Sequence, residues 1–390
     1  MSRALAGPIL LALVLRLLAI GVSDRVVADV ARYEKVSRHL LDVSWNPYET
    51  KRLYPYPPPW AAVEAGAGWL ARRGVLPFAI AVKLPVLAAD LLIVALLAVT
   101  VRARRAPAAA PWLYAAHPVA LLVGGVHGQF DAIPLVFVLV ALFALARERR
   151  DASALALSAA IAMKSFPVLL LPLLAVHGRA DGRSALRYVF LAAAPVALLL
   201  TPFALADPRA LVRELIAYSG IADFGWTAVM RGCEWLVAGS LPRSEARFWP
   251  AASLASKALF LGAWVALVVA LRAGRLRLDA ERASLAVVLA FLSLYGLLSA
   301  QYLLWAVPLG ALRPGRALLA YSAAATIGLA GFYLFLAPGV LWPRALDPAA
   351  AAWAGRFWLA GTAATLGASF CWLLATLREG HRLRAATDAR

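Results

Sequence analysis

The 390-residue chain is far more apolar than a soluble protein of its length, with 63% hydrophobic and 15% charged residues. Soluble domains are nearer half apolar and a quarter charged, and only a bilayer requires so much apolar surface. The net charge of +18 does not indicate nucleic-acid binding, because the arginines stand in short clusters between apolar segments. The two cysteines, Cys233 and Cys371, lie in unlike contexts, which argues against a disulfide framework or a metal site.

The first apolar segment, residues 4–22, has the composition of a signal peptide. Arg16 interrupts it, and no small-x-small cleavage site follows, so we expect an uncleaved first helix. With eleven later segments it predicts an all-α, polytopic membrane helical bundle of about 12 transmembrane helices, forming one domain over residues 1–390. Several segments are shorter than the ~20 residues that a perpendicular span needs, as expected where helices break or end in a cavity. The segments are residues 4–22, 76–101, 109–125, 130–147, 152–164, 166–177, 185–206, 249–271, 283–297, 301–312, 316–336 and 351–377.

Positive charge in the connections predicts the orientation, because cytoplasmic connections carry an excess of Lys and Arg. If residues 57–71 do not cross the membrane, the arginine clusters all fall on one side; if they do cross, every later cluster falls outside. We therefore expect both termini in the cytoplasm and two long extracytoplasmic loops, residues 23–75 and 207–248. The clusters are Arg102, Arg104 and Arg105; Arg147, Arg149 and Arg150; Arg179 and Arg183; Arg272, Arg275, Arg277 and Arg282; Arg313 and Arg316; and Arg378, Arg382 and Arg384.

The first outer loop is predicted to carry two helices that lie on the membrane surface. From Asp29 to Leu41, apolar residues recur at helical spacing, as in Val30, Tyr33 and Val36. The prolines at 57–59 stop any helix, and residues 60–71 are expected to form the second one. Loops of this length are usually functional.

Polar residues fall at the outer ends of several predicted helices: Asp29; His127, Gln129 and Asp131; Lys164; and Gln301 and Tyr302. Taken singly, each has an ordinary explanation as a helix cap, a surface carboxylate, an interfacial anchor or a snorkelling lysine. None of them entered the topology argument, and all fall on the same side. Ionisable groups at a membrane edge are costly and usually functional, so together they predict a polar site.

The combination of residue types indicates sugar transfer from a polyprenyl phosphate. A lysine among aromatic residues at the membrane edge can hold a phosphate whose lipid tail stays in the bilayer, and a carboxylate above it could deprotonate a sugar hydroxyl. Aromatic side chains of the outer loops could stack on sugar faces: Trp45, Tyr48, Tyr56 and Trp226. No cofactor is expected, because the leaving group is already an activated phosphate.

These motifs resemble the GT-C superfamily of polytopic glycosyltransferases over about residues 1–310. His127-Gly128-Gln129-Phe130-Asp131 looks like the His-x-Gln-x-Asn/Asp motif of dolichyl-phosphate-glucose-dependent glucosyltransferases. Ala300-Gln301-Tyr302-Leu303-Leu304-Trp305 looks like the Pro-Gln-Tyr-Leu-Leu-Trp pattern of prokaryotic and GPI-type mannosyltransferases, with Ala300 in place of the usual Pro. The remaining elements are Asp29, Asn46-Pro47-Tyr48, Tyr56-Pro57-Pro58-Pro59 and Lys164-Ser165-Phe166-Pro167.

The resemblance implies inverting, metal-independent transfer of a monosaccharide, mannose favoured, from a polyprenyl-phosphate donor to a glycan or lipid-linked acceptor on the extracytoplasmic face. It implies that Asp29 is the general base, with Asp24 as a second candidate. Asp131 would hold the acceptor or position the donor sugar. Lys164, and Arg231 in the second outer loop, would neutralise the phosphate.

Two other function classes stay open. A transporter or lipid-sugar flippase would need polar residues through the depth of the membrane, whereas here they cluster at one face. A structural membrane protein would need no such cluster. The sequence does not name the sugar or the acceptor, since glucose, arabinose and aminoarabinose donors fit equally well.

Overall fold

The computed structural model describes residues 3–103, 105–179, 181–216, 220–242, 250–342 and 344–388. In these ranges the chain is helical and contains no β-strand, which confirms the predicted all-α class. Arg104 of the arginine clusters, and residues 217–219 and 243–248 of the second outer loop, lie outside the described residues.

The helices follow the chain in short and long pieces. The first half comprises α1 (Arg3–Val22), α2 (Ala28–Asp42), η1 (Pro47–Thr50), α3 (Pro59–Arg72), α4 (Phe78–Ala81), α5 (Leu84–Arg102), α6 (Ala110–Ala115), α7 (Pro118–Ala120), η2 (Leu121–Val126), α8 (Ala132–Leu145), α9 (Arg150–Met163), η3 (Phe166–Leu170), α10 (Leu171–Ala175) and η4 (His177–Arg179). The second half comprises α11 (Gly182–Ala206), α12 (Pro208–Leu211), η5 (Val212–Ile216), α13 (Trp226–Ala238), α14 (Pro250–Arg272), α15 (Ala280–Leu294), η7 (Ala300–Leu304), α16 (Ala306–Ala311), α17 (Arg316–Phe335) and α18 (Pro348–Asp388).

Each of the twelve predicted apolar segments is helical, but several are broken into short pieces. Residues 109–125 form α6, α7 and most of η2, because His117 precedes Pro118 and takes an extended conformation there. In the described ranges, five helices are long and apolar enough to cross a membrane: Phe78–Arg102, Gly182–Ala206, Pro250–Arg272, Arg316–Phe335 and Pro348–Ala385. They mark a membrane protein, while the number of twelve crossings stays a prediction.

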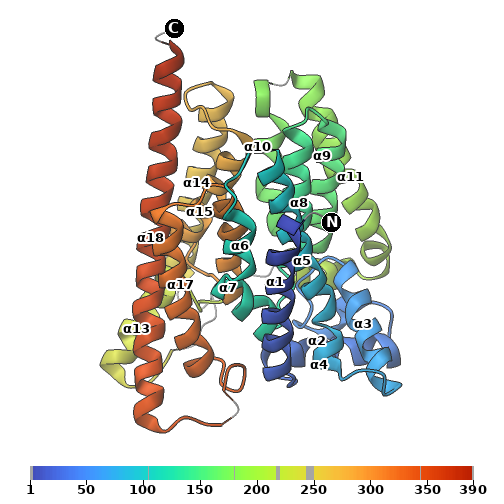
Figure 1. Ribbon diagram of the computed structural model, residues 1–390. Helices are drawn as coiled ribbons and strands as arrows, with labels where there is room; N and C mark the ends of the chain where they lie inside the picture. The colour runs from blue at the N-terminus through green and yellow to red at the C-terminus, as the bar shows by residue number, and fades with distance from the viewer. Residues whose placement is uncertain are drawn as a thin grey trace.

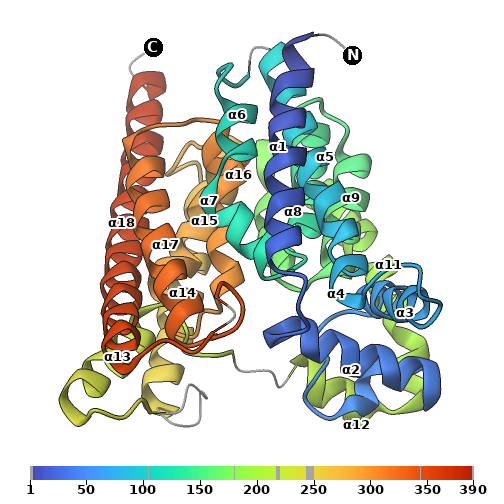
Figure 2. The same ribbon diagram turned by 60° about the horizontal axis from the view of Figure 1, so that its bottom comes forward.

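The helices pack into one elongated bundle. In Figure 1, α14, α15, α17 and α18 stand on one side, and α1, α5, α8 and α9 stand on the other. Close approach of α17 to α18 requires glycine, because a Cβ atom at Gly331 or Gly361 would collide with the backbone of the facing helix. Figure 2 shows both chain ends at one end of the bundle, with α2, α3, α12 and α13 at the opposite end.

A buried ion pair ties the first helices together in the bundle core. The Nε of Arg16 on α1 lies 2.9 Å from Oδ2 of Asp90 on α5, and the hydroxyl of Tyr114 on α6 donates to the other carboxylate oxygen at 2.5 Å. The two Nη atoms of Arg16 donate to the carbonyls of Tyr114 and Ala115. This pairing satisfies charges that would otherwise be costly away from water.

A buried lysine joins the outer ends of two helices. The Nζ of Lys83 donates to the Ser23 carbonyl at 2.6 Å and to the Val126 carbonyl at 2.9 Å. These carbonyls follow α1 and end η2, where helices leave backbone acceptors unpaired. Lys83 therefore sets the position of the turn that begins at His127.

Candidate active site

The turn between η2 and α8 presents His127 and Gln129 on one side of the chain. Its backbone is held by hydrogen bonds from the amide of His127 to the Leu122 carbonyl (2.9 Å) and from the amide of Gln129 to the Val123 carbonyl (3.0 Å). Between them Gly128 has φ +81°, a conformation that favours glycine, and a Cβ there would lie 2.9 Å from the Lys83 side chain. The local sequence thus requires this tight turn.

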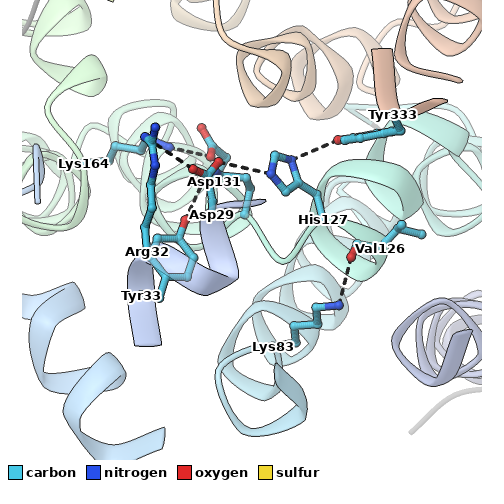
Figure 3. A network of polar contacts seen from close by, with 10 residues as sticks. Asp29, Arg32, Tyr33, Lys83, Val126, His127, Asp131, Lys164 and Tyr333 are labelled. Atoms are coloured by element: carbon cyan, nitrogen blue, oxygen red, sulfur yellow. Dashed lines mark hydrogen bonds and ion pairs between the residues drawn. The ribbon is translucent and has the colours of Figure 1, made fainter. Parts of the chain in front are cut away.

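Asp29 lies in the first turn of α2 and points at that turn (Figure 3). Its Oδ2 accepts a hydrogen bond from Nε2 of Gln129 and lies 3.1 Å from Nε2 of His127. Its Oδ1 lies 3.7 Å from a guanidinium nitrogen of Arg32, one helical turn later. The predicted residues Asp29, His127 and Gln129 therefore meet in one cluster.

A second shell of tyrosines orients the partners of Asp29. The Tyr33 hydroxyl donates to Oε1 of Gln129 at 3.1 Å, which leaves the amide nitrogen facing the carboxylate. On the other side, Nδ1 of His127 lies 3.2 Å from the Tyr333 hydroxyl of α17 (Figure 3). One carboxylate oxygen is thereby held from two directions.

The surroundings of Asp29 keep its carboxylate ionised. Burial alone raises the pKa of Asp29, but His127, Arg32 and Gln129 outweigh it and lower the pKa to about 2. The side chain is still 21% exposed. A fixed anion is thus accessible from outside the protein at any physiological pH.

Asp29 lines a cavity of about 180 Å³. This is smaller than the roughly 300–1,000 Å³ of drug-sized ligand pockets, so it has room for one small polar group. Side chains from several distant segments reach it: Asp29, Arg32 and Tyr33 of α2, Tyr56, His127, Asp223, Gln301 and Phe332 of α17. Sequence analysis had predicted four of these as site residues, namely Asp29, Tyr56, His127 and Gln301.

The predicted residues Asp131 and Lys164 form a buried pair beside the cavity. The Nζ of Lys164 donates to Oδ2 of Asp131 at 2.6 Å, and the indole of Trp305 donates to Oδ1, also at 2.6 Å. The ammonium also lies 4.7 Å from the centre of the Phe130 ring and 5.4 Å from that of Tyr56. Neither member of the pair lines the cavity, and Asp131 has both oxygens occupied.

An apolar pocket of about 260 Å³ adjoins the pair on another side. Phe166 and Trp305 line it and stack with ring centres 3.5 Å apart. Tyr302 also lines it, whereas the preceding residue, Gln301, faces the polar cavity. The Asp131–Lys164 pair therefore contacts the linings of both spaces, through Trp305 of the apolar pocket and Tyr56 of the polar cavity.

Three aromatic residues predicted to stack on sugar do not line the cavity. Tyr48 is fully buried, and its hydroxyl donates to the Tyr56 carbonyl at 3.0 Å. Trp45 is exposed and packs on Phe203, with ring centres 5.0 Å apart. The Trp226 indole donates to the Leu294 carbonyl at 3.1 Å. Of the four aromatics, Tyr56 alone is part of the cavity lining.

Asp24 and Arg231 are also set apart from the cavity lining. Asp24 is exposed. Arg231 is buried on α13, where it donates to the carbonyls of Pro242 (2.7 Å) and Ala222 (3.2 Å). Its guanidinium lies 3.8 Å from Oδ1 of Asp223, so it acts on the cavity through that carboxylate.

Two charged residues of the cavity escaped sequence analysis. Arg32 could have been found, because it lies three residues after Asp29 and therefore on the same face of the predicted helix. Asp223 carries no motif, and only the folded chain brings it to Asp29. Burial, together with the negative charge of Asp29, raises the pKa of Asp223 to about 6 against the opposing effect of Arg231.

Among the described residues, no three His, Cys, Asp or Glu side chains are grouped so that they could hold a metal ion. The metal-independence of the reaction stays a prediction.

Residues 31–179 match the family model described as alpha-(1->6)-mannopyranosyltransferase, N-terminal domain, of the MptA_B family. A comparison with curated proteins gives no match. The matched region contains His127, Asp131 and Lys164, while Asp29 lies just before it. The match supports glycosyltransferase activity and confirms that this membrane chain resembles a mannosyltransferase of the GT-C type.

Proposed function

We propose that the protein transfers one monosaccharide, with mannose favoured, from a polyprenyl-phosphate donor to a hydroxyl of a glycan or lipid-linked acceptor. The reaction would take place at the extracytoplasmic end of the bundle, which carries α2 and α3. The observation that carries the proposal is the ionised carboxylate of Asp29, held by Gln129 and His127 at the wall of a small polar cavity.

The geometry suits a single displacement. The acceptor hydroxyl oxygen attacks the anomeric carbon of the donor sugar, and its proton passes to Asp29 as the general base. The bond between that carbon and the phosphate oxygen breaks, and the phosphate leaves with the electron pair. Because attack and departure take place on opposite faces of the sugar, the configuration at the anomeric carbon inverts.

The two spaces beside Lys164 suggest how a lipid-linked donor would bind. A polyprenyl chain fits the aromatic lining of the apolar pocket, which begins at Ser165 and Phe166 directly after the lysine. The phosphate would then lie at the boundary between the pocket and the cavity. Arg32, with half of its side chain exposed, offers it a cation that is less tightly paired than Lys164.

The alternative of a transporter or lipid-sugar flippase has no observation in its favour. A translocation path would need polar groups open to a passage through the bundle. The charges of the bundle core at Arg16 and Asp90 are instead hydrogen-bonded to each other, to Tyr114 and to backbone carbonyls.

The proposal is tested with the purified protein in liposomes, given polyprenyl-phosphate mannose labelled in the sugar and a mannoside acceptor. We expect a labelled product one hexose larger than the acceptor, with an anomeric configuration opposite to that of the donor. Glucose and arabinose donors in parallel reactions identify the sugar. Movement of intact lipid-linked sugar across the bilayer without product would overturn the proposal in favour of a flippase.

A further inference from the structure

The backbone around Asp223 is fastened to a distant part of the chain. The amide of Phe224 donates to the Leu298 carbonyl at 2.8 Å, and the amide of Asp223 reaches the same carbonyl at 3.2 Å. The Trp358 indole donates to the carbonyl of Asp223 at 2.7 Å. Asp223 is therefore held in place by the chain just before Gln301 and by α18.

Glycines on both sides of Asp223 allow this close seating. Gly225 has φ +81°, and a Cβ atom there would lie 2.9 Å from the Gly296 carbonyl oxygen. Gly220 has φ +85°, and its Cβ would lie 2.8 Å from the Leu297 carbonyl oxygen. Both positions need a residue without a side chain, so the sequence is adapted to hold this segment against residues 295–298.

The carboxylate that this arrangement positions lines the same cavity as Asp29. Its side chain is 18% exposed, and its nearest charged partner is Arg231, 3.8 Å away. Among the described residues, no group donates a hydrogen bond to it, whereas Asp29 has Gln129 and His127 beside it. Asp223 is thus the less constrained of the two carboxylates.

Charged groups on three elements act on Asp223: Arg231 of α13, Asp29 and Arg32 of α2, and His127 of the turn before α8. Their balance and burial leave the pKa of Asp223 at about 6, while that of Asp29 is about 2. A proton released into the cavity is therefore held by Asp223 in preference to Asp29. Paired carboxylates with separated pKa values are a recurrent arrangement for acid–base work.

We propose that Asp223 is a second catalytic carboxylate, which takes the acceptor-derived proton from Asp29 and releases it to water outside. The acceptor O–H bond breaks, and its proton first binds Asp29. The proton then moves across the cavity to Asp223, which restores the Asp29 carboxylate for the next turnover. This role rests on the transferase function proposed above.

The first experiment measures kcat over pH 5 to 8 for the wild type, Asp223→Asn and Asp223→Glu in the liposome assay. The wild-type rate should fall below about pH 6, because protonated Asp223 accepts no proton. Asp223→Asn should lose about 100-fold in kcat, within the range of a positioned acid–base group, and its residual rate should lack that acidic limb. Asp223→Glu should keep the limb and most of the rate.

A matched control is Asp42→Asn, which removes an exposed carboxylate of α2 that pairs with Arg72. It should change neither the rate nor the pH profile. An Asp223→Asn variant with the wild-type rate and an unchanged acidic limb would overturn the role of Asp223 alone. If the wild type transfers no sugar, the proposed function fails and this role with it.

The second experiment does not depend on turnover. Infrared titration of the purified protein should show one carboxyl group that protonates near pH 6. The band should be absent in Asp223→Asn, and in Asp29→Asn it should titrate at lower pH, because the repelling charge of Asp29 is gone. A titration that is unchanged in Asp29→Asn would show that the two carboxylates do not interact, and would overturn the relay.

Discussion

Two sites in this bundle hold buried charge, and they differ in how completely the charge is satisfied. In the bundle core, both carboxylate oxygens of Asp90 have a partner at 2.9 Å or less, and the side chain is 1% exposed. At the outer end, Asp29 has one oxygen held closely, while its other oxygen has only Arg32 at 3.7 Å, and 21% of the side chain is exposed. The core pair is closed, and the outer carboxylate is open to a ligand.

The difference shows how a structural charge can be told from a functional one. Removing a partner in the core leaves a charge without solvation, so the cost falls on folding. Removing the charge at the outer cavity costs little folding energy, because the site is partly hydrated, but it abolishes chemistry. The predictions below test this division from the largest expected effect to the smallest.

Asp29→Asn should reduce sugar transfer by about 10⁴-fold, the upper end of what a positioned general base contributes. Neutral asparagine can still pair with Gln129 but cannot accept the proton. Single-turnover transfer in liposomes measures the loss, and the thermal unfolding temperature in detergent serves as the control for folding. Transfer within tenfold of wild type would contradict the assignment.

Arg16→Leu should destabilise the protein by about 3–5 kcal/mol, because it leaves the Asp90 carboxylate buried without its cation. The double variant Arg16→Leu, Asp90→Leu should recover most of that loss. Denaturant unfolding in detergent measures both variants. Activity per folded molecule should stay unchanged in the double variant, and a specific loss there would place this pair in the reaction instead.

Lys164→Met should be studied together with Asp131→Asn, because the single change leaves Asp131 uncompensated. In the double variant we expect about a 100-fold rise in the donor KM, as for the loss of a phosphate-stabilising cation. The acceptor KM should change by no more than about threefold. Equal rises in both constants would show that the pair supports the whole cavity and not the phosphate.

The lowered pKa of Asp29 predicts a small acid dependence of stability. Folding lowers this pKa from 3.8 to about 2, so the ionised form stabilises the native protein by about 2 kcal/mol at neutral pH. This stabilisation is complete above pH 4 and is lost as the pH falls towards 2. The difference in unfolding free energy between the wild type and Asp29→Asn should shrink over that interval, and a constant difference would contradict the lowered pKa.

Local patterns predicted more of this molecule than of its site. The helices α2 and α3 fall within two residues of their expected bounds, because apolar spacing and proline act over a few residues. The meeting of Asp29 with His127 and Gln129 was also foreseeable, since all three stand at helix ends that the arginine distribution assigns to one face. The pairing of Lys164 with Asp131 was not, because a motif names residue types without their partners.

By itself the sequence determined the all-α membrane class, the positions of the apolar helices and the gathering of polar residues at one end, because hydrophobic periodicity and charge act locally. Only the tertiary structure decided which of those residues share a cavity. It buried Tyr48, paired Lys164 and brought Asp223 to Asp29 across nearly two hundred residues of chain. Contacts between distant segments depend on the packing of the whole bundle, and the difference in pKa between the two carboxylates follows from that packing.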